Sequence, residues 1–275
     1  DIRHAADIRP HFEAVDVVFH QAAIRITACA ENWRECQEVL VDGSFNVAQA
    51  CAEAGVGKLV AASSASVYGL ADEFPTPETH HLYNNRTLYG AAKIANEAMY
   101  RALADMSGLR YLALRYFNVY GPRMDRQGRY TEVLMRWLDC LENGIPPRIH
   151  GDGRQTMDFV YVEDVARANI LAARSDLTDE VFNVASGREV SLNELLAALA
   201  RAAGRPEVQP QYLPPRAVNP VVRRCGCAEK ARRLLGFECQ ISLEEGLRRL
   251  VEWYRGSRNQ LNAAASALVT AGGMS

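Results

Sequence analysis

Tyr89 and Lys93 stand four residues apart in the segment Tyr89-Gly90-Ala91-Ala92-Lys93. On a helix, side chains at this spacing share one face. A nearby cation favours the phenolate, so it lowers the pKa of the tyrosine toward neutrality and makes Tyr89 a usable general base. Taken alone the pattern is weak, because an ordinary amphipathic helix with a snorkelling lysine also produces it.

Two serines precede this pair. Ser63 and Ser64 follow the apolar run that begins at Lys58, which predicts a buried strand ending at the carboxyl edge of a sheet. Parallel α/β proteins bind their ligands at this edge, and a serine hydroxyl there can relay a substrate proton to the phenolate. A serine cluster that caps a turn is the simpler interpretation. A strand, two serines, a loop and then Tyr-x-x-x-Lys is far more specific than either motif alone.

The elements that must position these residues alternate along the chain. We expect strands at 15–19, 58–63 and 110–115, with helices over 32–54 and near 86–107 between them. Gly55 and Gly108 end the two helices, and Asn84 or Asn85 caps the start of the second. This order predicts an α/β fold with a Rossmann-type, doubly wound parallel sheet that has helices on both faces.

The second half of the chain is less regular. We expect helices near 130–143 and at 163–174, and strands at 159–162 and 182–184. Ser191-x-x-Glu194 and Ser242-x-x-Glu245 are capping boxes, and each opens a leucine-rich helix. We expect the last helix to end near Gly256 and residues 257–275 to form a disordered tail.

Composition excludes several classes of protein. The chain has 275 residues, a formal net charge of -2 at pH 7, 48% hydrophobic residues and 23% charged residues. This balance lacks the basic excess that nucleic acids and anionic membranes attract. No apolar run is long enough to span a bilayer, and the charged start Asp1-Ile2-Arg3-His4 has no signal-peptide core. We therefore expect a cytoplasmic protein with no nucleic-acid partner and no membrane partner.

The cysteines and adjacent histidines do not predict a metal site. The seven cysteines are irregularly spaced, and the one close pair, Cys225-Gly226-Cys227, has no second pair to complete a zinc site. Reduced thiols, partly in the core, are the simpler interpretation. His80 and His81 are neighbours on a polar loop, so we do not expect them to converge on one metal.

The order of these motifs resembles the extended short-chain dehydrogenase/reductases, and within them the NAD-dependent sugar epimerase/dehydratase branch that includes the UDP-glucose and UDP-galactose 4-epimerases. The resemblance covers nearly the whole chain, as far as Arg255. The segments that carry it are Asp1-Ile2-Arg3, Val18–Ala23, Ser63–Gly69, Tyr89–Lys93, Leu114–Arg123, Gly151-Asp152-Gly153, Phe159–Val165, Phe182–Gly187 and Leu234–Phe237.

The resemblance implies roles for the matching residues. Tyr89 is the base that removes a sugar hydroxyl proton, Ser64 assists it, and Lys93 binds the nicotinamide ribose. The residues matched to NAD-binding positions are Asp1, Ile2, Ala22, Ala23, Arg25, Ser63, Tyr89, Lys93, Tyr116 and Phe117. Those matched to nucleotide-sugar positions are Ser64, Asn118, Ile149, His150 and Arg216. Arg216 matches an arginine that clamps the diphosphate, for which a guanidinium fork is suited.

The resemblance also implies a division of the chain and an absence. Residues 1–124 and 156–186 match the NAD-binding part, and residues 125–155 and 187–256 match the smaller mixed α/β part that binds the nucleotide sugar. The family begins with a strand and a G-x-x-G-x-x-G turn that holds the NAD pyrophosphate, and this sequence contains neither. We expect an N-terminally truncated chain that binds NAD poorly and aggregates along the exposed strand at 15–19.

Smaller departures concern the substrate. Met157 stands where many family members have an arginine, and Asn219 replaces a frequent aspartate. With Met157 neutral, Arg216 together with Arg154 or Arg223 must neutralise more of the diphosphate. These changes affect the identity of the sugar more than the type of reaction.

The predicted reaction is NAD-dependent 4-epimerisation of a UDP-sugar through a keto-sugar, with hydride removed and returned to the other face. The competing reaction, 4,6-dehydration, needs Asp-Glu after the Ser/Thr, where this chain has Ala65 and Ser66. The sequence is also compatible with a truncated chain that has no activity and with a binding protein that only retains the fold. We also expect a homodimer, formed through the helices that bear the tyrosine.

Overall fold

A four-stranded parallel sheet in the order β1-β2-β3-β8 organises the first part of the chain. The computed structural model describes residues 1–125, 133–215 and 221–272, and side chains as far as residue 258 within those ranges. The strands of the sheet are β1 (Val17–His20), β2 (Lys58–Ser64), β3 (Tyr111–Tyr116) and β8 (Glu180–Val184). β2 and β3 are buried on both faces, as their continuous apolar sequences require.

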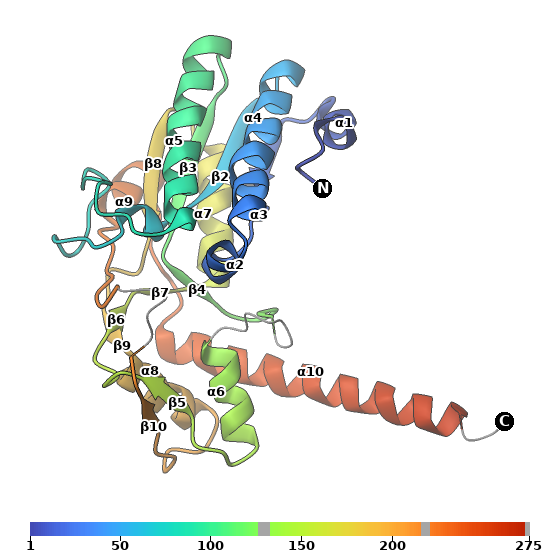
Figure 1. Cartoon of the computed structure of the whole chain (residues 1–275), viewed down its shortest axis with the longest axis vertical. Helices are drawn as coiled ribbons and strands as arrows, with labels where there is room; N and C mark the ends of the chain where they lie inside the picture. The colour runs from blue at the N-terminus through green and yellow to red at the C-terminus, as the bar shows by residue number, and fades with distance from the viewer. Residues whose placement is uncertain (126–132, 216–220, 273–275) are drawn as a thin grey trace.

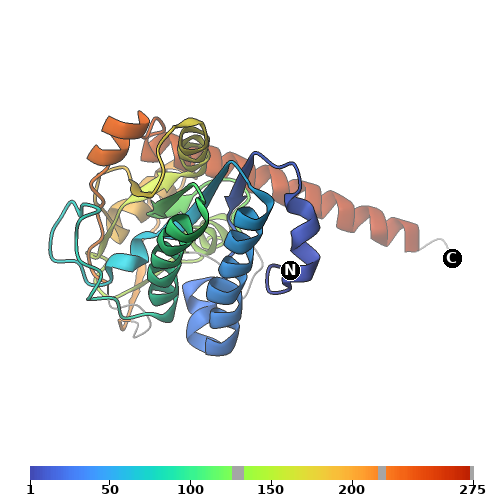
Figure 2. The ribbon, with the colours of Figure 1, turned by 90° about the horizontal axis from the view of Figure 1, so that it is seen from above.

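Helices cover both faces of this sheet. α4 and α5 lie side by side on one face and α7 lies on the other (Figure 1 and Figure 2). The helices of this part are α1 (Ala5–Ile8), α2 (Ile26–Glu31), α3 (Trp33–Gln37), α4 (Gly43–Ala54), α5 (Leu88–Ser107), α7 (Val162–Arg174) and α9 (Glu229–Leu235). Short 3-10 turns form η1 (Arg9–Phe12) and η3 (Ala65–Tyr68), and η2 (Glu38–Asp42) is a π-helical turn. The predicted α/β fold with a Rossmann-type parallel sheet is confirmed.

Two details of the predicted helices are wrong. The helix expected over 32–54 is divided into α3, η2 and α4, because the apolar spacing of a helix continues through a π-helical turn without a visible break. The cap of α5 is Thr87, whose hydroxyl accepts the backbone N–H of Gly90 at 3.1 Å. Asn85 instead accepts the N–H of Thr87 at 3.3 Å, so it orders the residue that caps the helix.

The second part of the chain has its own core. Its strands are β4 (Asn118–Tyr120), β5 (Arg148–His150), β6 (Thr156–Met157), β7 (Phe159–Tyr161), β9 (Val190–Ser191) and β10 (Gln211–Leu213). Its helices are α6 (Val133–Glu142), α8 (Leu192–Ala202) and α10 (Leu243–Gly272). The capping box of Ser191 and Glu194 is present at the start of α8. α6, α8 and α10 pack around the buried side chains of Trp137, Leu199 and Leu250.

α10 differs from the expected end of the chain. It continues to Gly272 rather than ending near Gly256, and its last turns extend away from the rest of the molecule (Figure 1). The expected disordered tail is therefore helical over residues 257–272. The physical reason is composition, because alanine and leucine, which are frequent here, have the highest helix propensities. No helix within the described ranges combines the length and apolar character needed to cross a bilayer.

Candidate active site

The carboxyl end of β2 and the start of α5 bring Ser64, Tyr89 and Lys93 together. Gly90 makes this approach possible, because a Cβ atom there would lie 2.6 Å from the backbone oxygen of Ser66. Ser64 hydrogen-bonds to the Tyr89 phenol. The Lys93 ammonium lies 5.9 Å from the centroid of the Tyr89 ring and donates to the Ala62 carbonyl at 2.7 Å. The three predicted catalytic residues therefore share one corner of the sheet edge.

The predicted lowering of the tyrosine pKa is wrong for this structure. Burial raises the pKa of Tyr89, and the opposing effects of the Ser64 hydrogen bond and the Arg224 charge do not overcome it. Lys93 does not deliver the expected shift, because burial lowers its own pKa to about 8 and its ammonium is directed at a backbone carbonyl. The helix spacing predicted the position of the cation correctly. It could not predict how completely the site is shielded from solvent.

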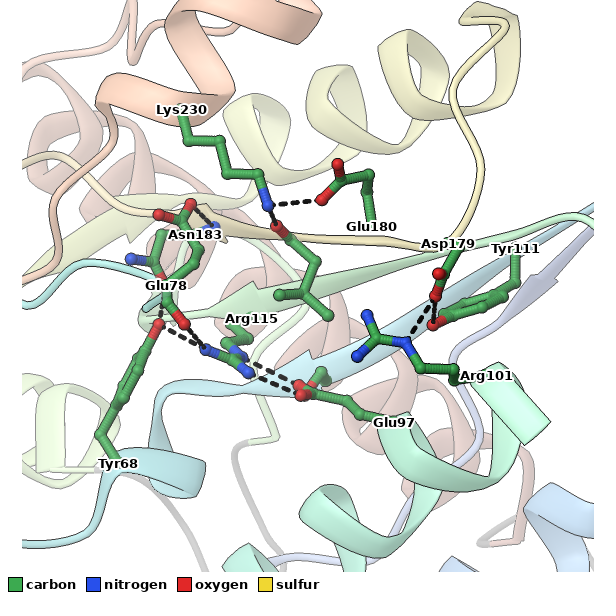
Figure 3. Close-up of polar contacts among 12 residues, drawn as sticks. Tyr68, Glu78, Glu97, Arg101, Tyr111, Arg115, Asp179, Glu180, Asn183 and Lys230 are labelled. Carbon is green, nitrogen blue, oxygen red and sulfur yellow. Dashed lines mark hydrogen bonds and ion pairs between the residues drawn. The ribbon is translucent and has the colours of Figure 1, made fainter. Parts of the chain in front are cut away.

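A buried ionic network joins the end of β2 to α5 and β3, and Figure 3 shows its charged members, Glu97 and Arg115. Glu97, on α5, accepts a hydrogen bond from the Ser63 hydroxyl and two from Arg115, at 2.9 Å from Nε and 2.7 Å from Nη2. Both charged side chains are almost fully buried. A buried charge is tolerated only when it is paired and hydrogen-bonded, so this pair fastens the end of β2 to α5 and β3.

The network continues from Arg115 to β8 (Figure 3). Arg115 donates to the Tyr68 hydroxyl at 2.9 Å, and that hydroxyl donates to Oδ1 of Asn183 at 2.7 Å. Glu78, in the loop before α5, accepts the backbone N–H of Asn183 at 2.8 Å. The sequence motifs assigned these residues no role. An arginine inside the apolar run at 111–116 was the available signal, since a charge in a buried strand requires a partner.

The residues matched to NAD-binding positions come from the N-terminus, from the segment after β1, from α5 and from the ends of β2 and β3. Ala22 and Ala23 follow β1 and are exposed. Ile2 packs on Gly43 at the start of α4, where a Cβ atom would lie 2.7 Å from the isoleucine side chain. Asp1 is exposed beside it and accepts the backbone N–H of Arg3 at 3.0 Å.

Three others reach the edge from neighbouring segments. Arg25 lies 3.8 Å from the carboxylate of Asp125. The Tyr116 hydroxyl donates to Oδ1 of Asn169 at 3.0 Å, so this ring is held toward α7. Phe117 is buried against Gly226, where a Cβ atom would lie 2.5 Å from the ring. The aromatic ring of Phe117 is therefore enclosed by the protein rather than exposed.

The donor set beside Tyr89 fits the nicotinamide ribose of NAD. An ammonium has three N–H donors, and among the described residues Lys93 uses one of them, on Ala62. The remaining donors suit a ribose diol, and Tyr89 lies on the same face of α5.

The residues matched to nucleotide-sugar positions differ in their surroundings. The Asn118 amide donates to the Asp158 carbonyl at 3.0 Å, and Nδ1 of His150 lies 3.0 Å from the Pro214 carbonyl. The Ile149 side chain is buried in the core, so only its backbone can face a ligand. Arg216 and Asn219 lie outside the described residues.

Arg224 is a cation that the sequence motifs did not reveal. Of the two arginines expected to assist Arg216, Arg223 is paired with Glu189 at 2.9 Å, and Arg154 is exposed near Asp152. Arg224 lines a pocket beside the dyad together with Ser66, Leu70, Arg86 and Thr87, and no carboxylate of the described residues lines that pocket. Burial lowers the pKa of Arg224 to about 10, and the charge of Tyr89 opposes this shift. Two arginines therefore line the pocket, and no carboxylate of the described residues does.

The chain is similar to known proteins of one family. Residues 1–185 match the family described as NAD dependent epimerase/dehydratase. The UDP-glucose 4-epimerase of Mycolicibacterium smegmatis is 37% identical over 246 residues, which cover 87% of this chain and 76% of that protein. The UDP-glucuronate 4-epimerase of Thermodesulfobacterium geofontis is 31% identical, over 92% of this chain and 77% of that protein. The structure of UDP-glucose 4-epimerase from Thermotoga maritima with UDP-glucose superposes with a TM-score of 0.88 at 34% identity, covering 94% of this chain and 83% of that one.

Proposed function

Because the chain belongs to the NAD-dependent epimerase/dehydratase family, we propose that it is a UDP-sugar 4-epimerase in which Tyr89 is the proton-transfer group. The observation that carries this proposal is the convergence of Ser64, Tyr89 and Lys93 at the carboxyl end of β2. This is the edge at which parallel α/β sheets bind ligands.

In the first half of the reaction the phenolate of Tyr89 takes the proton from the sugar 4-hydroxyl. Ser64 hydrogen-bonds both the phenol and the substrate hydroxyl, so it aligns the proton path. Lys93 holds the nicotinamide ribose with the N–H donors that Ala62 leaves unused. When bound, NAD supplies the acceptor for the hydride at C4 and later its donor.

In the second half the same groups act in reverse. After the 4-keto sugar has rotated in the site, bound NAD would supply the hydride to its opposite face, and Tyr89 would give the proton back to the oxygen. Burial raises the pKa of Tyr89 and favours the phenol, whereas the Ser64 hydrogen bond and the Arg224 charge favour the phenolate, which is the form that accepts the proton. Each turnover leaves both the proton and the hydride on the product.

Epimerisation is favoured over dehydration by the residues that follow Ser64. Elimination of water from C5 and C6 needs an acid and a base at the position of Ala65 and Ser66. Both residues are buried, and neither side chain titrates near neutral pH. No carboxylate of the described residues lines the pocket beside the dyad.

A second candidate substrate, a UDP-hexuronate, is supported by the pocket that Arg86 and Arg224 line. In a hexuronate the carboxylate carbon is two bonds from C4, so it would lie next to Tyr89 while C4 reacts. Two guanidinium groups that share their pocket with no carboxylate of the described residues suit such an anion.

A substrate panel tests both candidates. The purified chain with excess NAD should convert UDP-glucose, UDP-N-acetylglucosamine or UDP-glucuronic acid into its 4-epimer, and chromatography of the products shows which sugar reacts. A stable 4-keto-6-deoxy product, or no turnover of the three sugars, would overturn the epimerase proposal. If the uronate is preferred, Arg224→Gln should raise its KM and leave the KM for UDP-glucose unchanged.

We further propose a homodimer, a cytoplasmic location and the two-part division of the chain. α4 and α5 lie side by side (Figure 2), and Phe45, near the start of α4, is 40% exposed while Leu88, at the start of α5, is 49% exposed. Light scattering of the purified chain should give twice the monomer mass, and Phe45→Glu should give the monomer.

In the proposed division of the chain, the part with β5, β10 and α8 would hold the nucleotide, and the four-stranded sheet would hold NAD.

A further inference from the structure

The loop between Gly69 and Thr87 gathers three side chains that the proposed reaction does not use. Nε2 of His80 lies 2.7 Å from one carboxylate oxygen of Asp72, and Nε2 of His81 lies 3.7 Å from the other. One potential ligand atom from each residue lies within 4.8 Å of the others. The sequence-based expectation that adjacent histidines do not converge is wrong here, because the two rings stack, with centroids 4.4 Å apart, and their edges face the same carboxylate.

Hydrogen bonding fixes the orientation of the His80 ring. Nδ1 lies 2.7 Å from the His81 carbonyl, which can only accept, so Nδ1 is the nitrogen that donates. Nε2 then faces the Asp72 carboxylate, 2.7 Å from Oδ1. The ring nitrogen that is left for a metal ligand therefore lies on the side of the ring where Asp72 and His81 also place theirs.

We propose that Asp72, His80 and His81 bind a divalent transition metal, for which zinc is the best match. Imidazole nitrogen and carboxylate oxygen are zinc ligands, and three protein ligands leave one position for water. The bond from Nδ1 of His80 to a carbonyl is the arrangement that orients histidine ligands in metal sites. Tetrahedral ligands at about 2.0–2.1 Å from zinc lie roughly 3.3 Å apart, so small side-chain rotations suffice.

The metal would close a loop that forms one wall of the pocket beside Tyr89. Leu70 and Arg86, near the two ends of this loop, line that pocket. Its middle is already fastened, because the carbonyl of Thr76 and the carboxylate of Glu78 both accept hydrogen bonds from Asn183. The Asp72–His80–His81 cluster joins the two outer segments of the loop, on either side of that fastened middle. Zinc would therefore hold the pocket wall without touching the reacting sugar.

Zinc titration of the EDTA-treated full chain by calorimetry tests this proposal. We expect one equivalent to bind, and at least about tenfold weaker binding in His81→Gln and in Asp72→Asn. His4→Gln is the matched control, because Nδ1 of His4 also lies 3.7 Å from a carboxylate, that of Asp7, but has no second histidine beside it in the sequence. Equal zinc affinity in all four proteins, or no saturable binding below millimolar zinc, would overturn the proposal.

Two further measurements keep the result unambiguous. Zinc-edge X-ray absorption should report nitrogen and oxygen ligands, whereas a sulfur shell would assign the metal to cysteines such as Cys225 and Cys227 and refute the site. Limited proteolysis should cut the loop more slowly in the presence of zinc for the wild type and for His4→Gln, but at the same rate for His81→Gln. A variant that unfolds is identified by circular dichroism without zinc, and Asp72→Asn then serves alone.

Discussion

The interior of the sheet and its β1 edge differ in how far their side chains are buried. On β2, β3 and the facing side of α5, Ser63, Lys93, Glu97 and Arg115 are buried and hydrogen-bonded to one another or to the backbone. On β1 only His20 is buried, and Phe19 is 46% exposed. The proposed proton-transfer residues therefore sit on a preorganised scaffold, whereas Ala22 and Ala23, which follow β1, are exposed to solvent.

The largest expected effect is on the interior side. Tyr89→Phe removes the hydroxyl that exchanges the proton and retains the ring that packs against Cys29, Cys36 and Leu40, so we expect kcat to fall by about 10²- to 10⁴-fold with an unchanged melting temperature. Steady-state kinetics on the substrate that the panel identifies, with a thermal unfolding scan, measure both. Tyr83→Phe is the matched control, because Tyr83 is 88% exposed, and it should keep full activity. Near-normal turnover by the Tyr89 variant would remove the tyrosine from its role.

The same substitution at two arginines tests the contrast in stability. Arg115→Gln leaves Glu97 buried without its cation, which should lower the free energy of unfolding by about 3–5 kcal/mol. Arg101→Gln removes an ion pair of similar length, 2.7 Å to Asp179. The Arg101 side chain is 60% exposed and the Asp179 side chain 48%, so the expected loss is about 0–1 kcal/mol. Urea unfolding gives both values. Similar losses would mean that burial does not distinguish the two regions.

A pH-dependent contribution to the free energy of unfolding comes from His20, the buried last residue of β1. Burial, aided by the Lys93 charge, lowers the pKa of His20 to about 4, against roughly 6.5 in the unfolded chain. The unfolded state thus takes up a proton that the native state refuses, and stability is lost as the pH falls from about 6.5 to 4, by roughly 3 kcal/mol.

Asp158 contributes with the opposite sign in part of that range, because burial raises its pKa to about 6 and the native state binds the proton more tightly. The informative quantity is therefore the difference between the wild type and His20→Gln. Urea midpoints at several pH values should show a shallower acid loss in the variant, in which the Asp158 contribution is unchanged. If the wild type and the variant lose the same stability as the pH falls, groups other than His20 cause the acid sensitivity.

The sequence predicted the strands and main helices of the sheet because each is a local pattern of apolar residues. It also placed Ser64, Tyr89 and Lys93 together, since the carboxyl ends of parallel strands meet at one edge. Spacing could not predict the raised pKa of Tyr89, which depends on burial by several elements. Nor could it pair Glu97 with Arg115, because two residues on different elements have no fixed separation in the sequence.

The smallest expected effect concerns the β1 edge. Phe19 exposes an aromatic ring on a strand that pairs, among the described residues, with β2 alone. An apolar strand with unpaired backbone groups is a template for self-association, which a polar side chain reduces. Phe19→Thr supplies a β-branched residue and should lower the light scattering of concentrated protein, while changing the free energy of unfolding by less than about 1 kcal/mol. Val18→Thr, on the half-buried opposite face, is the control and should cost more stability without improving solubility. If both variants aggregate as the wild type does, association involves another surface, and the exposed face of α4 and α5 becomes the next one to test.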